Sequence, residues 1–179
     1  MQTTTKILTG ASYERTDAWA ERLAQRRRQA QVAAPAGEAC ADAWIAGAIT
    51  ALWTVFDNAV EQANAALERA GLAERLGARR TGQEYWLGMT GPGSEPRHIA
   101  VFVGLRAVED YVSGGAQITT SATRATIYLI LSVDGERLRW IVAQTGNEFT
   151  ARVVDDLLLS VFGDDPAATV RLSPYFSLG

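Results

Sequence analysis

Hydrophobic and polar residues between 38 and 70 repeat with the period of an α-helix. A second apolar row, Ala46, Trp53, Val60 and Leu67, lies beside a heptad row. The heptad row steps by four and three through Ile45, Ile49, Leu52, Phe56, Ala59, Ala63, Ala66 and Ala70. This stripe is bulky in its first half and lined by alanine in its second. We therefore predict one long helix over 38–70, ended by Gly71, with a face wide enough to meet a globular core.

A shorter helical arm is expected upstream, over residues 12–34. Thr16 or Asp17 is a suitable cap, Trp19 and Leu23 lie on one side, and the sequence PAG at 35–37 breaks the helix. The two arms then form a helical hairpin. Since the second arm is longer, part of its stripe needs another partner, which is either the chain's own sheet or the same helix in a second subunit. The candidate interface residues are Ile45, Ile49, Leu52 and Phe56.

Between residues 82 and 145 the pattern changes to the period of two that is typical of β-strands. Apolar residues alternate at Tyr85, Leu87 and Met89, and again from Ile99 to Leu105. The glycine-rich sequence GPGSEP joins the two runs, and it has neither the lysine nor the following helix of a phosphate-binding loop. We expect it to be a hairpin connection.

A second hairpin is predicted around Asp134-Gly135, because this dipeptide favours a two-residue turn between strands. If Val133 pairs with Glu136, one side of the hairpin is entirely apolar and should be the core. That side carries Ile127, Leu129, Leu131, Leu138, Trp140 and Val142. The opposite side carries Tyr128, Ile130 and Ile141 together with Arg124, Arg137 and Arg139.

The last part of the chain reads as a helix over 147–162, followed by a tail or edge strand over 167–179. Thr145 and Glu148 have the spacing of a capping box, and Gly163 ends the helix. The order of elements predicts a single α+β domain spanning 1–179. In it, an N-terminal helical hairpin packs its long helix on an antiparallel sheet of about four strands, and one C-terminal helix completes the fold.

Composition restricts the classes of partner. The chain has 179 residues, 17 basic and 20 acidic, so no global positive field attracts nucleic acid. The uncharged run of residues 43–56 falls short of a bilayer-spanning length, and we expect no membrane partner. A single cysteine, Cys40, and the lack of an apolar export signal near the start favour a cytoplasmic protein.

The sequence contains no recognisable catalytic motif. Its one histidine, His98, stands at a predicted strand start, where a surface role is more common than a catalytic one. The acidic pairs Glu109-Asp110, Asp155-Asp156 and Asp164-Asp165 are sequence neighbours that point apart on a helix. We therefore predict no catalytic residue, no metal site and no cofactor, and we lean towards a protein that is not an enzyme.

Two functions remain as expectations. The first is a non-catalytic interaction or regulatory protein that forms a homo-oligomer, with a dimer favoured, or binds a protein partner. Its partner surface would include Arg124, Tyr128, Arg137 and Arg139, since faces that mix arginine, tyrosine and aliphatic residues are typical of interfaces. The alternative is a small-molecule binding domain, with an anionic ligand recognised by arginine. Its pocket would lie between helices and sheet and be lined by Trp86, Phe102 and Trp140.

Overall fold

The structure is a computed structural model that describes residues 31–33, 38–92, 96–108, 111–123, 125–134 and 137–177. It confirms the α+β class. The strands of the described chain are β1 (Gln31–Ala33), β2 (Arg75–Thr81), β3 (Glu84–Thr90), β4 (His98–Val108), β5 (Tyr111–Thr120), β6 (Thr126–Asp134) and β7 (Arg137–Val142). The helices are α2 (Glu38–Arg69), α3 (Ala151–Phe162), α4 (Pro166–Leu172) and the short 3₁₀ turn η1 (Ser173–Tyr175).

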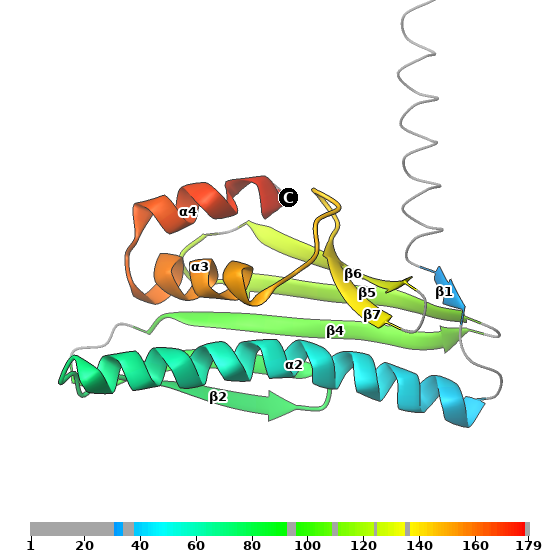
Figure 1. Cartoon of the computed structure of the whole chain (residues 1–179), viewed down its shortest axis with the longest axis horizontal. Coiled ribbons are helices and arrows are strands. Elements are labelled where there is room, and N and C mark those ends of the chain that lie inside the picture. Colours follow the sequence, from blue (N-terminus) through cyan, green and yellow to red (C-terminus); the bar gives the residue numbers. More distant parts are fainter. Residues whose placement is uncertain are drawn as a thin grey trace, which may run out of the picture.

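The strands from β2 to β7 follow their sequence order across one antiparallel sheet. Strand β1 joins at the side, pairing with residues 111–113 of β5. The helices α2 and α3 lie side by side along the sheet, and α4 lies against α3 (Figure 1). One hydrophobic core connects α2, the sheet and α3.

Helix α2 confirms the predicted long helix. Its end is a Schellman motif, in which the N–H of Gly71 donates to the carbonyl of Glu68 at 2.9 Å and the N–H of Leu72 to that of Leu67 at 3.0 Å. Gly71 has a φ of +71°, which glycine adopts without strain. The predicted stop signal therefore acts through backbone geometry.

The first half of the α2 stripe packs on the chain's own sheet. Leu52 and Phe56 are completely buried there, beside Trp53 and Val60. Ile45 and Ile49 are only partly buried. In this arrangement Leu52 and Phe56 have no surface left to offer a second subunit, so the part of the interface prediction that used them is replaced by a core role. Self-association itself stays a prediction.

The predicted helical arm over 12–34 falls mostly outside the described residues. At its end, however, the structure shows strand β1 instead of a helix. Backbone pairing of Gln31–Ala33 with β5 explains the difference, because hydrogen bonds to a strand edge replace those of the last helical turn.

The predicted count of about four strands is too low, because β2 and β5 lack the apolar–polar alternation from which strands were predicted. Strand β2 buries only Leu76, so it shows no apolar period. Strand β5 is interrupted by Gly114 and Gly115. A side chain at Gly114 would collide with the carbonyl oxygen of Gly104, and one at Gly115 with that of Leu129. These glycines allow the neighbouring strands to approach closely, but they also remove the apolar alternation that would have indicated a strand.

The β6–β7 hairpin has the predicted faces but a different register. Asp134 pairs with Arg137 and Val133 with Leu138, so Glu136 is not the partner of Val133. The partner of Val133 is displaced by two residues, from Glu136 to Leu138, and an even displacement keeps every side chain on its predicted face. All of the predicted core side is buried or packed against the core.

Helix α3 begins later than predicted, at Ala151, and the capping box is wrong. Residues 147–149 instead extend the sheet: Phe149 donates its N–H to the carbonyl of Trp140 at 2.7 Å, and Val142 donates to the carbonyl of Asn147 at 2.8 Å. Glu148 is therefore held in a bridge with Ile141 and cannot serve as a capping residue. The tail forms α4 and η1, and of an edge strand it keeps only the bridge from Ser177 to Thr126.

Candidate functional site

The two faces of the sheet differ in what covers them. Because side chains alternate along a strand, the strand register assigns each residue to one face. Tyr85, Leu87 and their neighbours point to the face covered by α2 and α3. The opposite face, which we call the open sheet face, carries Trp86, Phe102, Gln117, Tyr128, Ile130 and Ile141. None of the described helices packs its buried side on it.

Aromatic rings gather on the β3–β4 part of the open sheet face. Trp86 meets Phe102 edge to face, with ring centroids 5.7 Å apart at 88°. The ring of His98 lies 5.6 Å from that of Trp86. Trp86 is 38% exposed, and Tyr128, three strands further on in β6, is 44% exposed. Partly exposed aromatic rings gathered on one face are a feature of interaction surfaces.

A shallow hollow lies between the rings of Phe102 and Tyr128. It has a volume of about 580 Å³ and is bordered by Phe102, Gln117, Tyr128 and Ile130. Its floor is low because Gly104 pairs with Gly115 across β4 and β5, and neither has a side chain. The hollow is therefore shaped by the same glycines that let the strands approach closely.

Charged residues lie at the margins of the open sheet face. Arg79 and Glu84 stand on the β2–β3 side, Arg106 near one end of β4, and Arg139 on β7. Arg139 forms an ion pair with Glu148 at 3.8 Å. The centre of the face is uncharged, which is the arrangement of a protein interface with a polar rim.

The structure places two members of the predicted partner surface on the same face of the sheet, with Arg139 opposite Ser132, four residues along β6 from Tyr128. Tyr128 and Arg139 both project from the open sheet face. Arg137 pairs through its backbone with Asp134, and its side chain lies outside the described part of the structure. Arg124 also lies outside the described residues.

A buried polar contact holds α2 to the sheet. The hydroxyl of Tyr85 donates to Oδ1 of Asp57 at 2.9 Å, and Arg80 forms an ion pair with the same carboxylate. The Arg80 guanidinium also lies 5.8 Å from the centroid of the Tyr85 ring. Burial, and then the hydrogen bond to Asp57, raise the pKa of Tyr85 far above its usual range. A hydroxyl that stays protonated suits a structural contact better than proton transfer.

A second polar cluster joins α3 to α4. Asp156 is only 8% exposed, and it accepts a hydrogen bond from Nε of Arg171 at 2.8 Å. Asp165 lies 3.7 Å from the same guanidinium and also caps α4 by accepting from the N–H of Ala167. Each buried charge here has its partner, which accounts for the cluster as a structural one.

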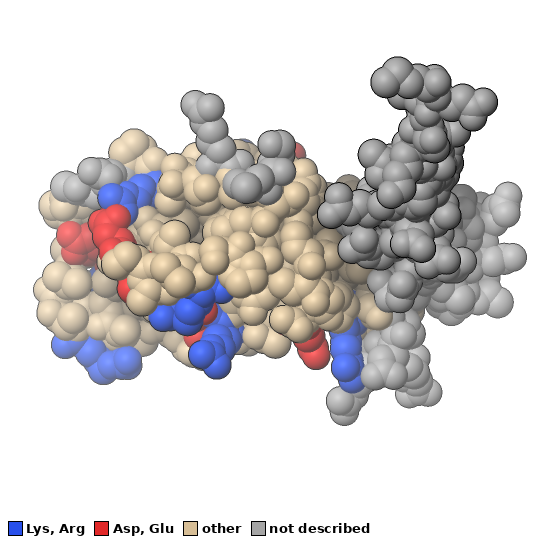
Figure 2. All heavy atoms as spheres, turned by 90° about the horizontal axis from the view of Figure 1, so that it is seen from above, with Lys and Arg blue, Asp and Glu red and all other residues tan. Residues whose placement is uncertain are grey.

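Charges of both signs mix on the surface around α4. Seen from that side, positive and negative side chains stand next to one another in small groups, and uncharged residues fill the space between them (Figure 2). No field of one sign dominates this view. A surface of this kind gives a polyanion little to hold.

No constellation for catalysis by metal appears among the described residues, where no three His, Cys, Asp or Glu side chains converge. His98 begins β4 and is exposed, as predicted for a hairpin end. The expected lack of catalytic, metal and cofactor sites stays a prediction.

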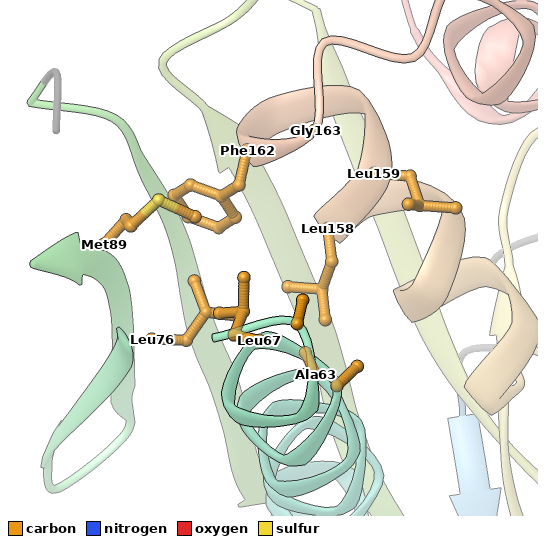
Figure 3. A pocket seen from close by; sticks show the side chains of 10 residues that line it. Ala63, Leu67, Leu76, Met89, Leu158, Leu159, Phe162 and Gly163 are labelled. Carbon is orange, nitrogen blue, oxygen red and sulfur yellow. The ribbon is translucent and has the colours of Figure 1, made fainter. Parts of the chain in front are cut away.

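An apolar pocket of about 320 Å³ lies between α2, α3 and the β2–β3 hairpin. Three alanines of α2 form one wall, Ala63, Ala66 and Ala70, and Figure 3 shows Ala63 on the side of the pocket opposite Phe162. Bulkier side chains form the rest: Leu67, Leu76, Met89, Leu158, Leu159 and Phe162. Sequence reasoning missed this site, although the alanine-lined half of the stripe was a visible sign of missing volume.

The pocket predicted from Trp86, Phe102 and Trp140 is wrong. Trp140 lies on the covered face, where its Nε1–H donates to the carbonyl of Ala48 at 3.0 Å. Trp86 and Phe102 lie on the opposite face of the sheet. Because side chains alternate along each strand, Trp140 is on the covered face of the sheet, whereas Trp86 and Phe102 are on the open sheet face.

Comparisons with protein-family models, with curated proteins and with solved structures find no match for this chain. By length and composition alone, residues 41–69 of α2 would suffice to cross a membrane. The same helix buries Leu52, Trp53 and Phe56 against the chain's own sheet, as the core helix of a globular domain does.

Proposed function

We propose that this protein is a non-catalytic interaction protein that self-associates through the open sheet face. The observation that carries the proposal is the uncharged centre of that face, where Trp86 and Tyr128 remain 38% and 44% exposed. An antiparallel sheet with one face in water normally alternates apolar and polar residues. Here the centre of the open sheet face holds Phe102, Tyr128 and Ile130, with Gln117 as a polar but uncharged neighbour.

The dimensions of the face suit a dimer. The strands β2 to β7 are 7, 7, 11, 10, 9 and 6 residues long. Six strands about 4.8 Å apart, with a mean length of about eight residues at about 3.3 Å each, give a face of roughly 760 Å². A standard interface buries about 800 Å² on each partner. A second copy presenting the same face supplies this area as a two-sheet sandwich.

The contacts within such a dimer follow from the side chains. Rings and branched aliphatic residues supply the contact area, with Tyr128, Ile130 and Ile141 on one half of the face and Trp86 and Phe102 on the other. Marginal charges such as Arg139 and Glu84 stay in water at the rim and set the orientation. The hollow over Gly104 and Gly115 receives a bulky side chain of the partner copy.

The test is the mass of the native particle, measured by size-exclusion chromatography with light scattering. We expect the wild-type chain to be a dimer. Replacing Tyr128 by Glu places a charge at the centre of the contact. A central tyrosine contributes about 2 kcal/mol, and twofold symmetry counts the change twice, so the dissociation constant should rise roughly 1,000-fold.

The matched control is Val170→Glu on α4. Val170 is 70% exposed and stands away from the open sheet face, so the same kind of change should leave the dimer intact. A wild-type chain that stays monomeric at high concentration contradicts the proposal. So does a Tyr128→Glu variant that dimerises as strongly as the control.

A further inference from the structure

The apolar pocket exists because α2 changes character along its length. Near the middle of the helix, Phe56 reaches the ring of Phe149, with centroids 5.9 Å apart, and fills the space in front of α3. One and two turns further along, Ala59 and Ala63 take the equivalent positions, followed by Ala66 and Ala70. The methyl groups do not reach across, so a space of about 320 Å³ remains between α2 and the end of α3.

The side chains around this space make no hydrogen bonds. In Figure 3, Phe162 lies beside Met89, and Leu158 points towards the alanine side of α2. The polar residue that follows Ala63 in α2, Asn64, is bonded to the backbone of Leu76. It donates to the carbonyl at 2.9 Å and accepts from the N–H at 2.7 Å. The N–H of Gly163 is likewise bonded to the carbonyl of Leu159.

Such a lining selects its occupant by chemistry. A ligand with polar groups would lose its hydrogen bonds to water inside the pocket and regain none. A hydrocarbon chain loses nothing, and its flexible methylenes adapt to an irregular wall that includes the thioether of Met89. Since a methylene occupies about the volume of a water molecule, roughly 30 Å³, the space matches a chain of about ten carbons.

We propose that the pocket between α2, α3 and the β2–β3 hairpin binds the unbranched hydrocarbon chain of a small molecule. The chain lies along the alanine wall formed by Ala63, Ala66 and Ala70. The polar end of the molecule stays outside in water, beside the 45% exposed Leu159. This site is separate from the open sheet face, because it lies on the covered side of the sheet. Its test therefore does not depend on the proposed self-association.

The methyl group of Met89 offers a direct readout. The chain has two methionines, Met1 and Met89, so carbon-13 labelling of methionine methyl groups gives two signals in an NMR spectrum. The signal that disappears in Met89→Leu is that of the pocket. We expect titration with decan-1-ol to shift this signal until it saturates.

The length of the chain should set the affinity. Hexan-1-ol, octan-1-ol and decan-1-ol differ by two methylenes at each step, and each buried methylene strengthens binding about fourfold, so each step should gain roughly 16-fold. Decanoate should bind about as well as decan-1-ol, because its carboxylate stays in water. No shift with either ten-carbon probe, or binding that is independent of chain length, overturns the proposal.

A pocket-filling variant locates the site. Ala66→Phe puts a ring into the space and should weaken decan-1-ol binding at least tenfold, and Ala70→Phe, one turn later, is the second variant should the first not fold. The control is Ala51→Phe, which adds the same ring to an exposed position of α2 away from the pocket. Wild-type affinity in both pocket variants contradicts the site. In the Tyr128→Glu variant, a Met89 shift that depends on protein concentration without any probe would assign the pocket to a second copy instead, and would also overturn the proposal.

Discussion

The two faces of the sheet are built from the same strands and meet different surroundings. On the covered face, Leu87, Val101 and Leu129 are buried under α2 and α3. On the open sheet face, the large rings of Trp86 and Tyr128 have no such cover from the described helices. The difference teaches that apolar residues alone do not mark the core. Local alternation decides which face a residue is on, and the placement of the helices decides which face is buried.

Removing a large side chain from the covered face should have the largest effect on stability. Phe56 is completely buried between Tyr85 and Phe149. Phe56→Ala leaves a cavity in the core and should lower the free energy of unfolding by about 3 to 5 kcal/mol. Urea denaturation followed by tryptophan fluorescence measures this, and a loss below about 1 kcal/mol would refute the core role of Phe56.

The next largest effect is expected where the strands themselves approach closely. A methyl group at Gly115 would collide with the backbone of Leu129, so Gly115→Ala should cost about 1 to 3 kcal/mol. Gly77 lies on the edge strand β2 with open space around it, and Gly77→Ala should change stability by no more than about 0.5 kcal/mol. Equal effects of the two variants in thermal denaturation would contradict the close approach of β5 to β6 at Gly115.

A smaller effect should come from the contact that fastens α2 to the covered face. Tyr85→Phe removes the hydrogen bond to Asp57, while Arg80 still pairs with that carboxylate. The free energy of unfolding should fall by about 1 to 2 kcal/mol.

The same contact also predicts a pH dependence. The folded state raises the pKa of Tyr85 above its ordinary value of 10.0, so its contribution is complete below pH 10. Above that pH the unfolded chain ionises first, and the contribution is lost as the pH rises further. Denaturation curves of wild type and Tyr85→Phe should therefore converge at alkaline pH, and a constant difference up to the highest accessible pH would speak against the buried hydroxyl.

The smallest change in stability is expected on the open sheet face. Tyr128→Ser, measured at a concentration low enough for monomers, should alter the free energy of unfolding by no more than about 0.5 kcal/mol, because Tyr128 is 44% exposed. A loss as large as that of Phe56→Ala would mean that Tyr128 belongs to a core, and the distinction between the two faces would fail.

Much of the fold follows from local patterns in the sequence. The long helix, its glycine stop, and the core side of the β6–β7 hairpin all depend on residues close together in the chain, such as Gly71 or the alternating Leu129 and Leu131. Strand β5 does not follow from local patterns. Its Gly114 and Gly115 are needed because neighbouring strands come close to them, and those strands lie outside the local sequence of β5. The capping box at Thr145 and Glu148 failed for a similar reason, since pairing with β7 competes for the same backbone.

The candidate surfaces were predictable to different degrees. The placement of Tyr128 and Arg139 on one face follows from hairpin alternation. The apolar pocket does not follow, because Ala66 and Phe162 are far apart in the sequence and come together only when α3 packs beside α2. Surfaces made by packing between elements need a structure, whereas surfaces made within one hairpin do not.

The central claim is that the open sheet face is covered by a second copy of the chain. The most direct measurement is light scattering of the wild type, Tyr128→Glu and Val170→Glu across a range of concentrations. The account predicts a dimer for the wild type and Val170→Glu, and a monomer for Tyr128→Glu at concentrations where the other two are paired. A monomeric wild type, or three identical mass profiles, would contradict it.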